Sequence, residues 1–91
     1  MNKSARKMFE ELGYKKTNSD LLTYRSEYGG YIKQIMFSEV GHRIIFREWE
    51  DYNDYQPQGQ FTVYTDLLQA INQQCKELGW LDEWRRTFEK R

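Results

Sequence analysis

The chain is poor in the residues that build disulfides and metal sites. Its 91 residues include one cysteine, one histidine and one proline. The single cysteine, Cys75, excludes an intramolecular disulfide, and with His42 it supplies too few ligands for a cysteine–histidine zinc site. We therefore expect no metal and no cofactor. Cys75 falls on the apolar side of a predicted helix, which favours a buried structural thiol.

The chain also lacks an excess of charge of either sign and any long apolar run. Fourteen basic and fourteen acidic residues give a formal net charge of zero, which argues against binding to nucleic acid by bulk electrostatics. The first residues, MNKSARKMFEELGY, contain no apolar run typical of secretion, and no segment reaches the length of a membrane span. The sequence predicts a cytoplasmic protein that makes no contact with membranes.

The length suits one small core. A chain of this size buries only about 60–65% of its unfolded surface, and an aromatic content of 16% helps because large rings bury much area per residue. We expect a single α+β domain over residues 1–91. Residues 81–91 are expected to form a peripheral tail or one short extra helix.

Two nearly identical pentapeptides, EELGY at 10–14 and KELGW at 76–80, predict where two helices end. In each, leucine completes an apolar stripe, glycine adopts the left-handed conformation and the aromatic residue packs back on the last turn. Apolar spacing predicts helices near 5–12 and 66–78. Their expected N-caps are Asn2 or Ser4 for the first helix and Thr65 for the second.

Short alternating segments between the helices predict an antiparallel sheet of three to four strands. The segments are 21–26, 31–38, 43–50 and 61–65, and the breaks at 27–30 and 39–42 are short enough for hairpins. Helices at both ends of the chain would flank this sheet and bury its apolar side. The predicted core residues are Met8, Phe9, Leu12, Ile32, Met36, Ile44, Phe46, Val63, Leu67, Leu68, Ile71 and Leu78.

Catalysis is not expected. Nucleophilic attack by Cys75 would need a base, and the only imidazole, His42, lies in a predicted turn where it is solvated. The glycines of YGGY at 28–31 indicate a hairpin and no phosphate-binding loop. The carboxylates near residue 50 lack the spacing of a calcium loop.

The stretch 48–59 is the most distinctive in composition, since it is rich in carboxylates and aromatic rings and holds no basic residue. Tyrosine and tryptophan offer large, stiff contact area, and clustered carboxylates can steer a basic partner. The opposing interpretation is an acidic loop that protects a sheet edge from aggregation. The hypothetical partner-binding residues are Glu48, Trp49, Glu50, Asp51, Tyr52, Asp54 and Tyr55.

Basic residues gather near both ends of the chain and suggest an alternative, nucleic-acid-binding module. Aromatic and basic residues also interleave in the strands, as base-stacking surfaces require. Ordinary solvated faces explain the same pattern. The candidate residues for this alternative are Lys3, Arg6, Lys7, Lys15 and Lys16 near the first helix and Arg85, Arg86, Lys90 and Arg91 in the tail.

The two helix-end regions, ARKMFEELGYKK and LLQAINQQCKELGW, are similar to the ends of small uncharacterised proteins of phages, prophages and integrative elements of Gram-positive bacteria. This resemblance covers residues 5–80 and leaves out the tail from Leu81. It implies a small non-catalytic accessory protein that acts by binding another protein. An inhibitor of a host defence complex, as anti-CRISPR proteins are, is the sharper form of that expectation.

Overall fold

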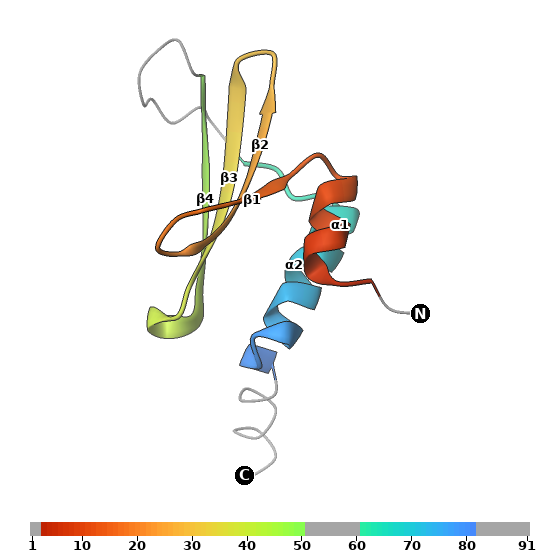
Figure 1. Ribbon diagram of the computed structural model, residues 1–91, viewed down its shortest axis with the longest axis vertical. Helices are drawn as coiled ribbons and strands as arrows, with labels where there is room; N and C mark the ends of the chain where they lie inside the picture. Colours follow the sequence, from red (N-terminus) through yellow and green to blue (C-terminus); the bar gives the residue numbers. More distant parts are fainter. Residues whose placement is uncertain (1–2, 51–60, 82–91) are drawn as a thin grey trace, which may run out of the picture.

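The computed structural model describes residues 3–50 and 61–81, which form a two-layer α+β arrangement with both helices on one side of a sheet (Figure 1). This confirms the predicted order of helix, four strands and helix. The elements are α1 (Ala5–Glu11), β1 (Lys15–Thr17), β2 (Leu22–Tyr28), β3 (Tyr31–Ser38), the short 3-10 helix η1 (Val40–His42), β4 (Arg43–Glu50) and α2 (Thr65–Glu77).

The strands lie in chain order, β1-β2-β3-β4, and each neighbouring pair is antiparallel. Gly29 and Gly30 form the two-residue turn between β2 and β3, with φ of 60° and 79°. Two left-handed residues in succession give the turn twist that matches the strands of a hairpin. The predicted strands 31–38 and 43–50 are confirmed at both ends.

The fourth strand differs from the prediction. Residues 61–64 are not in a strand, and Thr65 begins α2. The fourth place in the sheet belongs to β1, whose sequence Lys-Lys-Thr has no apolar alternation and which pairs with β2 through its backbone. The alternation of 61–65 was therefore misleading, because a strand-like pattern depends on its packing context more than on an intrinsic backbone preference.

Both helices end at the predicted Leu-Gly-aromatic sequence. Gly13 and Gly79 adopt φ of 92° and 80°. At the end of α1, Tyr14 N donates to Phe9 O at 2.9 Å and Gly13 N donates to Glu10 O at 3.0 Å. These two bonds define the Schellman motif, and the contact of the Tyr14 and Phe9 rings completes it, with centroids 5.9 Å apart.

One of the two predicted N-caps is confirmed. Ser4 Oγ accepts a hydrogen bond of 3.2 Å from Lys7 N at the start of α1. Thr65 does not cap α2, because the helix starts one residue earlier than expected: Tyr64 holds the cap position and makes no side-chain cap bond. Asp66 instead accepts a 2.7 Å bond from Leu67 N, where the helix dipole favours a carboxylate.

The core lies between the helices and one face of the sheet. Phe9 is at its centre, stacked on Tyr24 with ring centroids 4.0 Å apart and in edge contact with Phe37. The Ala5 amide donates to Glu77 Oε2 at 2.7 Å, which ties the start of α1 to the end of α2. The buried cluster comprises Ala5, Phe9, Tyr14, Tyr24, Ile35, Phe37, Leu67, Ala70, Ile71, Cys75 and Trp80.

The predicted core is correct in part. Phe9, Ile32, Leu67 and Ile71 are buried, and Met8, Leu12, Met36, Ile44 and Leu78 are half-buried. Phe46, Val63 and Leu68 were predicted wrongly, with exposed fractions of 37%, 38% and 55%. Val63 precedes α2 outside any strand, and Leu68 lies on the side of α2 away from the sheet.

The strand faces were also assigned wrongly in one respect. The prediction placed Ile32 and Met36 toward the helices, whereas Ile35 and Phe37 occupy that side and belong to the core. Ile32 and Met36 therefore lie on the open face, although Ile32 is only 1% exposed. Its cross-strand neighbour Trp49 is a large side chain on the same face.

Cys75 is buried, as predicted, and this burial raises the pKa of its thiol. His42 is exposed but stacks on Trp80, with ring centroids 4.6 Å apart and planes 4° from parallel. Within residues 3–50 and 61–81, no helix combines the length and apolar character needed to cross a membrane.

Candidate functional site: a tyrosine-lined groove

A groove of about 570 Å³ opens on the helix-bearing side of the sheet, near the β2–β3 turn. Four of its lining residues are tyrosines that come from different parts of the chain, and one carboxylate and one ammonium group lie among them. We call it the tyrosine groove. Its lining residues are Leu12, Tyr14, Ser26, Tyr28, Tyr31, Lys33, Glu48, Thr62 and Tyr64.

The end of α1 and the strand register place these side chains together. The Schellman turn carries Tyr14 from α1 toward the sheet. Antiparallel pairing sets Lys33 of β3 beside Glu48 of β4, and Tyr28 beside Tyr31. Tyr31 Oη reaches diagonally across the strands and donates to Glu48 Oε2 at 3.0 Å. Glu48 is thus fixed by a tyrosine hydroxyl at the wall of the groove.

The tyrosine hydroxyls beside Glu48 stay neutral at ordinary pH. Burial, and then the negative charge of Glu48, raise the pKa of Tyr14 to about 12. Partial desolvation, the hydrogen bond to Glu48 and the charges of Glu48 and Glu50 raise the pKa of Tyr31 as well. The groove therefore offers neutral hydroxyls and aromatic surface around one carboxylate.

Lys33 and Glu48 face each other in the register but do not form an ion pair. The ion pairs among the described residues are Lys3–Glu11, Arg6–Glu10 and Arg25–Glu27. The Lys33 ammonium lies 5.7 Å from the centre of the Phe61 ring, where the ring quadrupole attracts it. The half-buried Glu48 carboxylate therefore contacts the Tyr31 hydroxyl and not the Lys33 ammonium.

The structure separates the predicted acidic–aromatic surface. Glu48 and Glu50 lie on the helix-bearing side of β4, and Trp49 lies on the open face with Ile32. The guanidinium carbon of Arg25 is 5.9 Å from the centre of the Trp49 ring. Asp51, Tyr52, Asp54 and Tyr55 lie outside the described residues.

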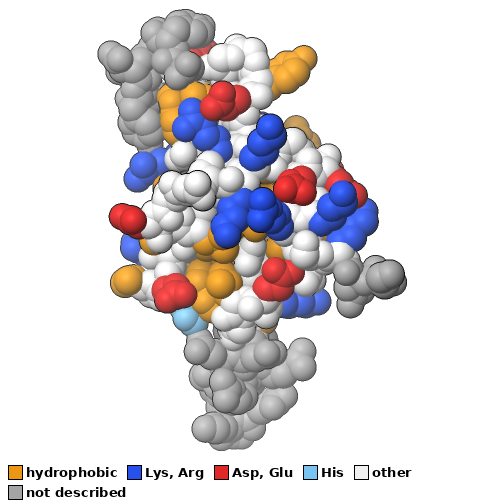
Figure 2. All heavy atoms as spheres, in the orientation of Figure 1, with side chains coloured by type: hydrophobic (Ala, Val, Ile, Leu, Met, Phe, Trp, Pro, Cys, Tyr) orange, Lys and Arg blue, Asp and Glu red, His pale blue; other side chains and the backbone are white. Residues whose placement is uncertain are grey.

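The N-terminal basic residues do not form one patch. Lys3, which precedes α1, and Arg6 pair with acidic residues of α1, at 2.8 and 3.4 Å, and the bond from Lys3 holds the pKa of Glu11 below its usual range. Lys15 and Lys16 point to opposite faces of the sheet, since Lys15 pairs with Arg25 and Lys16 with Tyr24. Figure 2 shows basic and acidic side chains interspersed over this view of the molecule. Arg85, Arg86, Lys90 and Arg91 lie outside the described residues.

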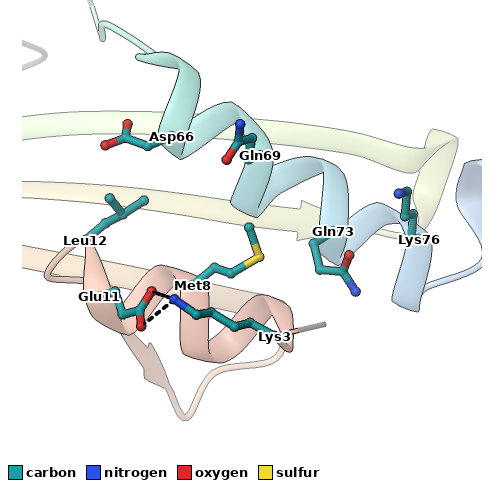
Figure 3. A pocket seen from close by; sticks show the side chains of 8 residues that line it. All are labelled: Lys3, Met8, Glu11, Leu12, Asp66, Gln69, Gln73 and Lys76. Carbon is teal, nitrogen blue, oxygen red and sulfur yellow. Dashed lines mark hydrogen bonds and ion pairs between the residues drawn. The ribbon is translucent and has the colours of Figure 1, made fainter. Parts of the chain in front are cut away.

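A second groove, of about 470 Å³, runs between α1 and α2 (Figure 3). Met8 extends from α1 toward α2, and Gln69 and Gln73 lie across from it. Lys3 Nζ closes one side of it with bonds of 2.8 and 2.9 Å to the Glu11 carboxylate. Because Lys3 and Glu11 already pair with each other, this groove is the weaker candidate for a binding site.

Sequence reasoning missed most of the tyrosine groove. Of its residues only Glu48 was a predicted site residue, and Leu12 was predicted as core. Its four tyrosines come from three separate parts of the chain, namely Tyr14, the hairpin pair Tyr28 and Tyr31, and Tyr64, and their convergence depends on the sheet register and the turn after α1. Comparison of the chain with protein-family models, curated proteins and solved structures finds no match. The resemblance to proteins of mobile elements stays a prediction.

Proposed function

We propose that the chain is a small non-catalytic accessory protein that binds another protein, and that the tyrosine groove receives an arginine side chain of that partner. The observation that carries this proposal is the position of Glu48. Its half-buried carboxylate is held by Tyr31 at 3.0 Å, lies among four tyrosines and makes none of the ion pairs found among the described residues.

The chemistry of the groove supports arginine as the anchoring group. A guanidinium pairs with a carboxylate through a planar fork of donors and also stacks on aromatic faces. Tyrosines supply contact area at low cost in side-chain entropy, and tyrosine and arginine are the residues in which interface energy concentrates. Tyr28 and Tyr64 are 87% and 69% exposed, so both rings are accessible to a partner.

A peptide titration followed by amide NMR shifts tests the proposal. The probes are two acetylated, amidated nonapeptides of glycine and serine, one with three arginines and one with three glutamates. We expect the arginine peptide to shift the amides of Tyr28, Tyr31 and Thr62, and the glutamate peptide to leave them in place. Glu48→Gln keeps an oxygen for the Tyr31 bond and removes the charge. We expect the arginine peptide to bind this variant about tenfold more weakly, a loss of about 1.4 kcal/mol in binding free energy.

Glu39→Gln is the matched control, because it removes one exposed carboxylate at the opposite end of β3. It should bind the arginine peptide as the wild type does. Shifts that spread over the whole surface, or an equal loss in both variants, would show that the peptide responds to charge alone and would refute the role of the groove.

A further inference from the structure

The face of the sheet that points away from the helices carries a line of basic residues across its strands. The register sets Lys15 opposite Arg25, Arg25 opposite Gln34, and Gln34 opposite Arg47. We call Lys15, Arg25 and Arg47, with the neutral Gln34 between the two arginines, the cationic row. They lie on the open face because their chain neighbours Tyr24 and Ile35 belong to the core. With neighbouring strands about 4.8 Å apart, the row spans roughly 14 Å.

The strand residues of this face carry an excess of positive charge. Arg43, opposite Ser38, adds a fourth basic residue, and Glu27 is the one acidic residue that the strands place there. Glu27 forms an ion pair with Arg25, whose Nε lies 2.9 Å from Glu27 Oε1. That N–H does not point along a hydrogen-bond direction, so the contact is an ion pair only. Because the whole chain is neutral, this excess is a local feature of the face.

Apolar side chains border the cationic row on both sides. Ile32 and Trp49 are paired on one side, and Met36 and Ile45 are paired on the other. Arg25 contributes to both features, since its guanidinium lies against the Trp49 ring at 5.9 Å. Cations in a line beside aromatic and apolar surface are what a flexible polyanion with flat bases requires.

We propose that this open face binds single-stranded nucleic acid, with the phosphates along the cationic row and bases against Trp49 and the half-buried Met36 and Ile45. A single strand fits better than a duplex, because a row of roughly 14 Å on a four-stranded face is wider than the major groove of about 12 Å. This site differs from the N-terminal and tail clusters suggested by the sequence, with which it shares only Lys15. It is also independent of the tyrosine groove on the other side of the sheet.

Fluorescence anisotropy with a labelled fifteen-nucleotide oligothymidine and oligouridine, and with a duplex of equal length, tests the proposal. The wild type should bind both single strands more tightly than the duplex. If three cations contact phosphates, the plot of log affinity against log salt should have a slope of about −2, at about −0.7 per contact for single strands. Lys15→Gln/Arg47→Gln should weaken binding at least tenfold at low salt and bring the slope to about −0.7.

Lys7→Gln/Lys76→Gln is the control, because it removes the same charge from exposed positions on the two helices. It should keep the affinity within twofold and the slope unchanged. Circular dichroism melting of all three proteins checks that each is folded. The proposal is overturned if the wild type fails to bind at low salt, if the control loses as much affinity, or if the duplex binds as tightly. Variant-sensitive binding of polyglutamate without oligonucleotide binding would identify an acidic protein as the occupant and would also overturn it.

Discussion

Tyr24 of β2 donates a hydrogen bond of 2.6 Å to Gln74 Oε1 of α2 inside the core. Both residues are buried, with 2% and 6% of their surface exposed. The bond joins the sheet to the second helix across fifty positions of sequence. Tyr24 also stacks on Phe9 of α1, so one side chain connects the sheet to both helices.

Loss of this hydrogen bond should be costly. Tyr24→Phe keeps the ring stack on Phe9 and removes the hydroxyl, which leaves the buried Gln74 amide without this partner. We expect a loss of about 1–3 kcal/mol in the free energy of unfolding, measured with urea. Tyr28→Phe, at a residue 87% exposed, is the control and should change stability by less than about 0.5 kcal/mol. Equal effects in the two variants would contradict the role of the Tyr24–Gln74 bond.

Truncating a side chain to alanine should destabilise the protein strongly on the buried side of α2 and hardly at all on its exposed side. Ile71 is 5% exposed and belongs to the core, so Ile71→Ala should cost about 2–5 kcal/mol. Leu68 is 55% exposed, and Leu68→Ala should stay within about 0.5 kcal/mol of the wild type. Thermal or urea denaturation of the pair measures the difference. A larger loss at Leu68 would mean that the face of α2 has been assigned wrongly.

The Schellman turn after α1 needs glycine for its left-handed backbone conformation and not for lack of space around a side chain. Gly13 has φ of 92°, and a Cβ placed there would meet no atom within 4 Å. Gly13→Ala should therefore cost about 1–2 kcal/mol, the strain of a left-handed conformation in a residue with a Cβ. Unfolding in urea measures it, with Ser4→Gly as a change at the other end of α1 that should cost a few tenths of a kcal/mol. An unchanged midpoint for Gly13→Ala would show that the turn relaxes.

Stability should fall in alkali. The pKa of Tyr14 is raised from 10.0 to about 12 in the folded chain, and burial raises the pKa values of Tyr24 and Cys75 in the same direction. A raised pKa means that folding favours the neutral phenol. This contribution is complete below about pH 10, the unfolded value, and disappears as the pH rises toward 12. Urea unfolding between pH 9 and 12 should show this decline, and Tyr14→Phe should make it shallower. A wild-type curve that is flat over this range would contradict it.

Sequence patterns predicted the elements whose signals are local. Leu-Gly-aromatic endings and apolar spacing gave both helices, and alternation between clear breaks gave β3 and β4. The strand β1 has no such signal, because three polar residues pair through their backbone. The inward face of β3 could not be read from alternation, since Ile32 and Met36 alternate with Ile35 and Phe37 and both sets are apolar.

The candidate site was less accessible to sequence reasoning. Composition pointed to acidic and aromatic residues after residue 47 as a surface for a basic partner. The structure combines Glu48 with tyrosines contributed by other segments and turns Trp49 to the opposite face. Neither the tyrosine groove nor the cationic row exists in the linear sequence, because both arise from the register of the strands.

Site-specific photocrosslinking in living cells tests the central claim, that the tyrosine groove is the partner-binding surface. Benzoylphenylalanine would replace Tyr28, at the end of β2, in one protein and Val40, in η1, in another, with exposed fractions of 87% and 75%. We predict a discrete crosslinked product from position 28 that disappears when Glu48→Gln is added, and none from position 40. Equal crosslinking from both positions, or a product at position 28 that survives Glu48→Gln, would contradict the account.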